Sequence, residues 1–364
     1  MWDFSWLERR WPGAGYENWD QALDELLERG YDALRIDAYP HLVAAHANKT
    51  WLLEPVWNTQ DWGAPALVRV RVVPELHQFI AKCRERNVKV GLSTWFRQDE
   101  SKTRRGISEP QRMAEIWNIT LAGIREAGLL DAILYVDLCN EWPGPIWAPV
   151  LGVPDNGHWS DARSMEWMRT AIAGVRAEFS ELPLLFSTDN ERVEDFAESD
   201  VRFIDAIEHH LWMAGENNDE FYRHIGYHYE RFSEAGYRNL QLTGVSTYAE
   251  RPAYWQGLLT HKIARLASAA RRANLPLMTT ECWAVVDYKD WPLLPWDWVK
   301  ELCALGAESA LSTAQWVAIA TSNFCGPQFH GMWRDVAWHQ RLTALIKSAP
   351  ISEGLKRGRL WNRL

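Results

Sequence analysis

The chain has 364 residues, 47% of them hydrophobic and 24% charged, with a formal net charge of −9. This composition is typical of a soluble globular protein with a large core, and the acidic balance argues against nucleic acid or an anionic membrane as a partner. No apolar run approaches the roughly 18 residues of a membrane span, and the N-terminal MWDFSWLERRWPG lacks the layout of a signal peptide. We therefore expect a cytoplasmic protein.

The first well-marked element is a predicted helix over residues 18–30, NWDQALDELLERG. Asn18 is a typical N-cap residue, Gln21 stands three residues later as in a capping box, and Gly30 is a typical helix stop. The apolar residues recur at i, i+3, i+4 and i+7, which is the pattern of an amphipathic helix. A predicted strand, YDALRIDAY, follows at once.

The same alternation of strand and helix continues along the chain. Strands are predicted at 3–6 (DFSW), 31–39, 88–96, 131–141, 182–189, 203–212, 276–283 and 311–323. Helices are predicted at 18–30, 74–86, 108–126, 164–180, 191–198, in segments between 217 and 273, at 297–309 and at 335–348. Eight strands, each followed by a helix, indicate an α/β fold, a (β/α)8 TIM barrel in a single domain over residues 1–364.

Three long loops, at 39–73, 142–163 and 212–256, mostly follow predicted strands. In a parallel barrel the carboxyl ends of the strands carry the catalytic loops, so these loops are expected on the functional face.

The five cysteines are Cys83, Cys139, Cys282, Cys303 and Cys325. Their number is odd and none forms a CxxC pair, so the pattern favours reduced thiols over disulfides or structural zinc. The chain also has no glycine-rich phosphate loop. We therefore expect no cofactor and no metal.

Tryptophan is unusually abundant, with 23 residues. Nine of them fall in Pro-, Gly- or Asn-rich stretches that are typical of loops: Trp51, Trp57, Trp62, Trp142, Trp147, Trp159, Trp291, Trp296 and Trp298. Flat amphipathic rings in loops suit pyranose sugars, which have apolar faces and polar edges. The alternative is that large loops need aromatic anchors for packing, and composition alone favours neither interpretation.

Two glutamates end predicted strands. The apolar run ILYVDLCNE closes the fourth strand with Glu141, and MTTE closes the seventh with Glu281. The barrel would bring these residues, far apart in sequence, to the same rim. Two carboxylates about 5 Å apart are the arrangement with which retaining glycosidases attack an anomeric carbon and protonate the leaving oxygen.

With these residues in place, the sequence resembles the clan A glycoside hydrolases, the cellulase-like (β/α)8 retaining enzymes. The resemblance covers most of the chain at the level of strand order. It implies that Glu141 is the acid/base, that Asn140 contacts the sugar 2-hydroxyl and that Glu281 is the nucleophile.

The resemblance also implies further site residues. Arg35 in ALRIDAY stands where the family has an arginine that supports the nucleophile. His210 and Trp212 in EHHLW stand where the family often has His-x-Tyr on strand six. Trp316 in TAQW lies on strand eight, where the family stacks a tryptophan under the sugar.

Other interpretations remain open for several of these residues. Arg35 could simply neutralise Asp37 or Asp137 inside the barrel. Because His209 and His210 alternate faces on a strand, one of them is expected to be a packing residue.

Two more tryptophans, Trp95 and Trp283, are candidate substrate contacts or, equally, packing at the rim. The sequence also departs from the family pattern, because Trp212 replaces the usual tyrosine that donates a hydrogen bond to the nucleophile. Tyr248 is one possible substitute.

The best-supported function is a retaining glycoside hydrolase, an exo-acting β-glycosidase on short oligosaccharides or glycosides, with a small carbohydrate as its partner. Two alternatives are kept. A metal-dependent barrel such as a sugar isomerase could use Glu141, Asp189, His210 and Glu281 as ligands. A non-catalytic sugar-binding barrel is the third hypothesis, although a pure binder has no need of two opposed carboxylates.

Overall fold

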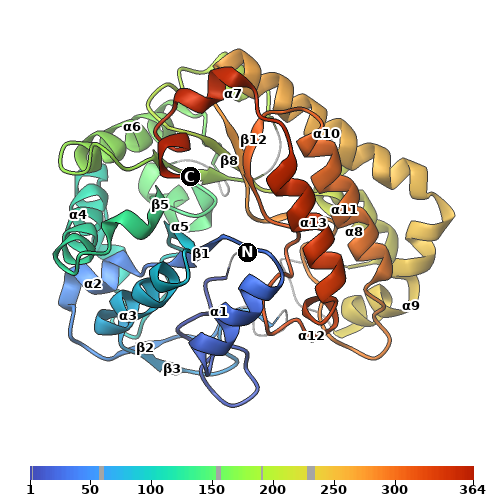
Figure 1. The fold of residues 1–364 in the computed structure, drawn as a ribbon, viewed down its shortest axis with the longest axis horizontal. Coiled ribbons are helices and arrows are strands. Elements are labelled where there is room, and N and C mark those ends of the chain that lie inside the picture. Colours follow the sequence, from blue (N-terminus) through green and yellow to red (C-terminus); the bar gives the residue numbers. More distant parts are fainter. Residues whose placement is uncertain (2, 57–60, 153–156, 190–191, 228–233) are drawn as a thin grey trace.

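The computed structural model describes residues 1–364 except 2, 57–60, 153–156, 190–191 and 228–233. Parallel strands form the centre of the molecule and helices surround them, which is the predicted (β/α)8 barrel (Figure 1). The first sheet has the order β1 (Ala33–Asp37), β4 (Lys89–Ser93), β5 (Ile133–Asp137) and β6 (Leu184–Leu185). The second has the order β7 (Ser187–Thr188), β8 (Ile207–His209), β10 (Leu277–Thr279) and β12 (Trp316–Ile319). Only Phe186 separates β6 from β7, so the two sheets run on from one another.

The prediction of the first strand at 3–6 is wrong. The chain turns at Phe4, and the Asp3 carboxylate accepts a hydrogen bond from the backbone N–H of Ser5, as in an Asx turn. The backbone contacts with β1 come from earlier residues: Asp3 N donates to Arg35 O at 2.9 Å, and Arg35 N donates to Met1 O at 3.0 Å. Met1 and Asp3 therefore bond to β1 slightly earlier in the chain than the predicted strand.

The surrounding helices agree with the predicted ranges to within a few residues at most ends. They are α1 (Trp19–Glu28), α3 (Val72–Glu85), α4 (Pro110–Glu126), α6 (Ala162–Arg176), α7 (Asp195–Glu198), α10 (Pro252–Ala273), α11 (Asp297–Leu311) and α13 (Val336–Ser348). The short helix α12 (His330–Trp333) was not predicted. Asn18 caps α1 by accepting from the N–H groups of Asp20 and Gln21. The Gln21 side chain bonds Glu25 instead of returning to Asn18, so only half of the capping box forms.

Two of the long loops, 39–73 and 142–163, contain regular structure that the sequence patterns did not reveal. The 39–73 loop holds α2 (Pro40–His46) and the antiparallel pair β2 (Trp51–Leu53) and β3 (Val68–Val70). The 142–163 loop holds α5 (Gly144–Leu151). In the 212–256 loop, α8 (Glu216–Ile225) and α9 (Glu234–Glu250) agree with the helical segments predicted between 217 and 273.

A second, short parallel pair extends two of the barrel strands. β9 (Leu211–Trp212) pairs with β11 (Cys282–Trp283), and Leu211 N donates to Glu281 O at 3.2 Å. β9 follows β8 in the sequence and β11 follows β10, so this pair extends both barrel strands. It therefore holds His210 and Glu281 side by side at the end of their strands.

The barrel interior is closely packed at the level of the site. A Cβ placed on Gly91 of β4 would overlap the ring of Tyr135 on β5, so this strand position needs glycine. All five cysteines are buried free thiols, as predicted. Among the described residues, no helix combines the length and apolarity that crossing a bilayer requires.

Candidate active site

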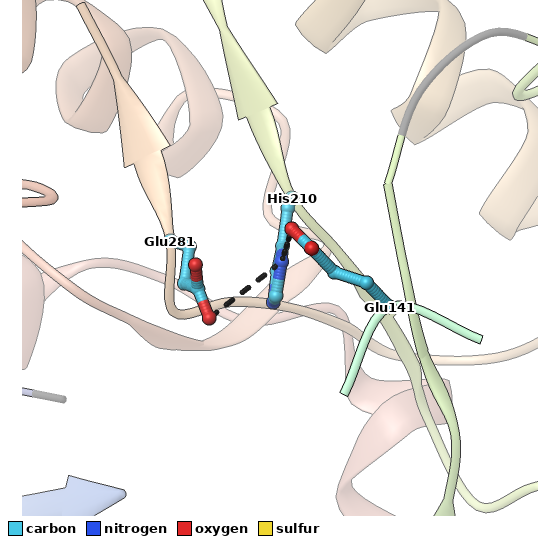
Figure 2. Close-up of side chains that lie close together, drawn as sticks. All are labelled: Glu141, His210 and Glu281. Carbon is cyan, nitrogen blue, oxygen red and sulfur yellow. Dashed lines mark hydrogen bonds and ion pairs between the residues drawn. The ribbon is translucent and has the colours of Figure 1, made fainter. Parts of the chain in front are cut away.

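Five of the predicted site residues converge at the carboxyl ends of four strands. Arg35 lies within β1, Asn140 and Glu141 follow β5, His210 lies between β8 and β9, and Glu281 lies between β10 and β11. Figure 2 shows Glu141 and Glu281 approaching His210 from either side. The barrel therefore assembles, from distant parts of the chain, the cluster that strand order predicts.

The two glutamates occupy different depths of this site. One carboxylate oxygen of Glu141, one of Glu281 and a ring nitrogen of His210 all lie within 4.8 Å of one another. The Glu281 side chain is 8% exposed, whereas that of Glu141 is 33% exposed. Glu281 thus lies deeper in the site than Glu141.

The backbone at Glu141 has an unusual conformation. Its φ is +51°, in the left-handed region that costs a non-glycine residue energy and that occurs often at functional sites. Two hydrogen bonds to β7 hold the turn, from Glu141 N to the Ser187 hydroxyl at 3.0 Å and from Trp142 N to the Ser187 carbonyl at 2.9 Å. The turn aims the carboxylate across the barrel mouth.

Arg35 is the buried cation under the two glutamates. Its Nη1 donates to Glu281 Oε1 at 3.2 Å, and its Nη2 donates to Asn140 Oδ1 and lies 3.5 Å from Asp137 Oδ2. Its guanidinium also packs 4.5 Å from the ring centroid of Trp95. Arg35 therefore combines the two roles that the sequence left open, since it neutralises Asp137 and contacts Glu281.

His210 bridges the carboxylates. Its Nδ1 lies 2.9 Å from Glu141 Oε1 and 3.8 Å from Glu281 Oε1, and its Nε2 lies 2.9 Å from Glu208 Oε2. Burial by itself lowers the pKa of His210, but the negative charges of Glu208 and Glu281 outweigh burial and raise that pKa well above its usual value. His209, by contrast, packs against Phe196 and bonds Thr188 through Nδ1 at 2.9 Å. Of the two histidines, His209 is therefore the packing residue that was predicted for one of the pair.

The charge of Glu281 is set by opposing influences. Burial raises the pKa of Glu281 to about 7, and the neighbouring carboxylates of Glu141 and Glu208 act in the same direction. His210 and Arg35 oppose this rise. The carboxyl group therefore titrates near neutral pH, and its ionised form depends on these two cations.

Neither Trp212 nor Tyr248 replaces the usual tyrosine on strand six. Trp212 packs edge-on against His210 with ring centroids 6.0 Å apart, and an indole cannot supply a hydroxyl group. Tyr248 lies on α9 and donates to Glu301 Oε1 at 3.0 Å, so the structure does not bring it to Glu281. The cations that face Glu281 are Arg35 and His210.

Two predicted substrate contacts do not lie beside the carboxylates. Trp283 is fully buried, donates to the carbonyl of Ala320 at 3.0 Å and packs against Gly306 of α11. Trp316 is opposite Leu277 in the sheet register and donates to Thr279 Oγ1 at 2.9 Å, so its buried ring lies below the rim. Neither ring presents a face to a sugar in this structure.

Most of the tryptophans predicted in loops serve as anchors. Those buried in the structure are Trp51, Trp62, Trp142, Trp147, Trp159, Trp296 and Trp298, and Trp57 lies outside the described residues. Trp291 differs, with 49% of its surface exposed. For the described members of this group, packing rather than a general display of sugar-binding faces explains their abundance.

The cluster also bears on the metal-dependent alternative. Glu141, His210 and Glu281 come together, but Asp189, the fourth predicted ligand, is not part of this group. Arg35 Nη1 lies 3.2 Å from both Glu281 Oε1 and His210 Nε2, and the raised pKa of His210 favours protons on both ring nitrogens. A cation bound here would meet two resident positive charges, so the arrangement favours acid–base chemistry.

Glu208 is a buried residue of the site that the sequence patterns did not predict. Glu208 lies in the middle of β8, is buried, and accepts hydrogen bonds at Oε1 from Thr280 N at 2.7 Å and Thr280 Oγ1 at 2.9 Å. The signal was an acidic residue inside a predicted strand, AIEHHLW, two residues before His210. A buried charge of this kind needs a partner, which only the fold identifies.

Known proteins resemble this chain over most of its length. A family model described as sugar-binding cellulase-like matches residues 1–347. A crystal structure from Parabacteroides distasonis ATCC 8503, described as a candidate glycoside hydrolase, is 54% identical with a TM-score of 0.97, over 100% of this chain and 98% of that one. The comparison with curated proteins found no match.

More distant structures share the fold. An endo-β-1,4-mannanase from Thermotoga petrophila is 10% identical with a TM-score of 0.56, over 96% of this chain and 76% of that one. A GH5_18 protein from Bifidobacterium longum, in complex with Manβ1-4GlcNAc, is 13% identical with a TM-score of 0.54, over 97% and 80% of the two chains. The chain belongs to the sugar-binding cellulase-like family and is a glycoside hydrolase.

Proposed function

We propose that this enzyme is a retaining β-glycosidase in which Glu281 is the nucleophile and Glu141 the acid/base. The observation that carries the proposal is the approach of the two carboxylates, with oxygens within 4.8 Å. Retaining enzymes hold the two carboxyl groups about 5–5.5 Å apart, whereas inverting enzymes need about 6.5–9.5 Å to admit a water molecule.

The different depths of the two glutamates support the assignment of roles. In the first step, Glu281 attacks the anomeric carbon while Glu141 gives its proton to the leaving oxygen, and a glycosyl ester of Glu281 forms. A nucleophile must be ionised, and Arg35 at 3.2 Å favours the charged form of Glu281. Glu141, which is more exposed, is better placed to reach the outgoing group.

The second step reuses the same pair. Once Glu281 is esterified its negative charge is gone, and Glu141, now ionised, takes a proton from an incoming water molecule. The water oxygen attacks the anomeric carbon and releases Glu281 as a carboxylate. Two inversions return the sugar with its original anomeric configuration.

Asn140 is proposed to bind the sugar. Its Oδ1 accepts a hydrogen bond from Arg35, which orients the side chain and leaves Nδ2 as the group that can donate to a sugar hydroxyl. Asn140 is adjacent to Glu141, so such a bond would form next to the reacting carbon. This supports the 2-hydroxyl contact that the family resemblance implies.

For the substrate we propose a short β-linked oligosaccharide or glycoside, cleaved from one end. The loops at 39–73 and 212–256 fold into a hairpin and helices, which are structures able to wall a cleft. The GH5_18 structures from Bifidobacterium longum and Streptomyces cattleya hold Manβ1-4GlcNAc or GlcNAc, which makes β-mannosides a sensible first choice in a screen.

The test is a panel of aryl β-glycosides with the purified protein, followed by proton NMR of the first-formed sugar anomer. We expect hydrolysis that is unaffected by EDTA and a β-configured first product. An α-configured product would overturn the nucleophile assignment. Sugar binding without turnover would instead favour a non-catalytic barrel, and activity lost with EDTA would favour a metal-dependent enzyme.

A further inference from the structure

Glu208 is a buried carboxylate that the proposed reaction does not yet use. Its side chain is fully buried in β8. Thr280 fixes Oε1 with two hydrogen bonds, and Oε2 lies 2.9 Å from Nε2 of His210. A buried carboxylate is costly, so this placement needs partners that offset its desolvation.

The ion pair with Glu208 orients the imidazole ring of His210 and so determines which groups its two ring nitrogens face. Arg35 Nη1 also lies 3.2 Å from Nε2, but a guanidinium only donates and cannot accept a proton from the ring. Glu208 Oε2 forms an ion pair with Nε2 at 2.9 Å, although the two atoms are not aligned as a hydrogen bond, and the carboxylate is the negative group beside Nε2. With the Nε2 side of the ring held by this ion pair, Nδ1 faces Glu141 at 2.9 Å and Glu281 at 3.8 Å.

The charged groups around His210 lie on or just after the four strands that form the site, β1, β5, β8 and β10. The negative ones are Glu208 on β8, Glu141 after β5 and Glu281 after β10, and the positive neighbour is Arg35 on β1. Asp137 and Tyr135 on β5 face Arg35 from below. Together, the acidic groups outnumber the cations, which favours the doubly protonated imidazolium.

We propose that Glu208 is a positioning residue of the reaction: by its ion pair with the Nε2 side of His210 it aims Nδ1–H at the catalytic carboxylates, in place of the missing strand-six hydroxyl. This inference rests on the proposed function. In the free enzyme Nδ1–H binds Glu141. When Glu141 turns to the leaving oxygen, the same N–H faces Glu281, the nearest remaining acceptor. The imidazolium then donates to the nucleophile, as the tyrosine hydroxyl would.

The first test does not need turnover. In Glu208→Gln, which keeps size but removes charge, we expect the pKa of His210 to fall, because the largest charge that raises it is gone. Nitrogen-15 NMR of the imidazoles follows this titration, and His210→Asn identifies the signals. In Glu208→Asp the charge is kept, so the titration should remain near that of wild type.

The second test uses kcat/KM on an activated aryl β-glycoside, whose leaving group needs no proton from Glu141. Under these conditions the alkaline limb of the pH profile reports His210 rather than the acid. Glu208→Gln should lower kcat about 10–100-fold with little change in KM, the range expected when a group acting in the transition state is misplaced. Its alkaline limb should move to lower pH, and Glu208→Asp should partly restore both.

A matched control and a double variant separate positioning from general damage. Glu8→Gln removes another buried carboxylate without touching this cluster, so its pH profile should keep the wild-type shape. Glu208→Gln should cost little more in a His210→Asn background, since both act through the same ring. The proposal is overturned if the His210 titration is unchanged in Glu208→Gln, or if the two losses multiply. A wild-type protein without glycosidase activity would contradict the proposed function instead, whatever the NMR result.

Discussion

Two buried ionic clusters lie in this barrel, and they are built differently. In the first, Arg97 pairs with Glu8 through two hydrogen bonds of 2.7 and 2.8 Å, and Tyr39 donates to the same carboxylate at 3.1 Å. In the second, four carboxyl groups, those of Asp137, Glu141, Glu208 and Glu281, surround only two cations, Arg35 and His210. The first cluster is matched in charge and the second has an excess of acid.

The difference separates a structural pair from a reactive one. A matched bidentate pair satisfies both partners, and its protons have no reason to move. In the acid-rich cluster the pKa of Glu281 is raised to about 7 and that of His210 is also raised, so protons there are exchangeable near neutral pH. Four variants test this contrast.

The largest effect is expected for Glu281→Gly. Loss of the nucleophile should reduce turnover by about 10⁴-fold or more, with fold and sugar affinity largely kept, because the residue supplies covalent chemistry. Azide or formate should partly restore activity on an activated β-glycoside, and azide should give an α-glycosyl azide. Kinetics and product NMR provide the measurement. A folded variant with near-native turnover would show that the acid-rich cluster is not the catalytic centre.

The next effect concerns Glu141→Ala. Substrates with poor leaving groups should lose about 10²–10⁴-fold in kcat/KM, because they need a proton, while activated aryl glycosides should lose much less at this step. Rates for a series of leaving groups measure the difference. Equal losses across the series would show that Glu141 is not the acid.

Glu8→Gln should affect stability rather than chemistry. It leaves the buried guanidinium of Arg97 without its charged partner, and we expect a loss of roughly 3 kcal/mol in the free energy of unfolding. Denaturant unfolding measures this loss, and kcat of the folded variant should stay close to wild type. A large fall in kcat at unchanged stability would show that the Glu8–Arg97 cluster takes part in the chemistry and is not only structural.

The smallest effect is a pH dependence of stability due to Glu281. Its pKa is raised in the folded state, so the folded protein holds this proton more firmly than the unfolded chain does, and stability is lost as pH rises towards about 7. Replacement by Gln removes this titration, so between pH 4.5 and 7 wild type should lose about 1–3 kcal/mol relative to Glu281→Gln. Thermal or denaturant unfolding across this range is the measurement. Parallel pH curves for the two proteins would contradict the raised pKa.

The sequence by itself determined the order of elements and the two glutamates of the site. Helix periodicity, the Asn18 cap and the apolar strands are local signals, and they predicted most helices to within a few residues. Because parallel strands of a barrel end at one face, strand order alone was enough to predict that Glu141 and Glu281 would meet.

Only the tertiary structure decided what each side chain contacts. The register of β12 buries Trp316 below the rim, the Asx turn at Asp3 displaces the first strand, and the pairing of β9 with β11 places His210 beside Glu281. The partners of Glu208 are likewise supplied by Thr280, far away in sequence, and by the orientation of a neighbouring ring. These contacts depend on distances between segments remote in the chain, and local patterns do not encode such distances because each is set by the packing of the whole barrel.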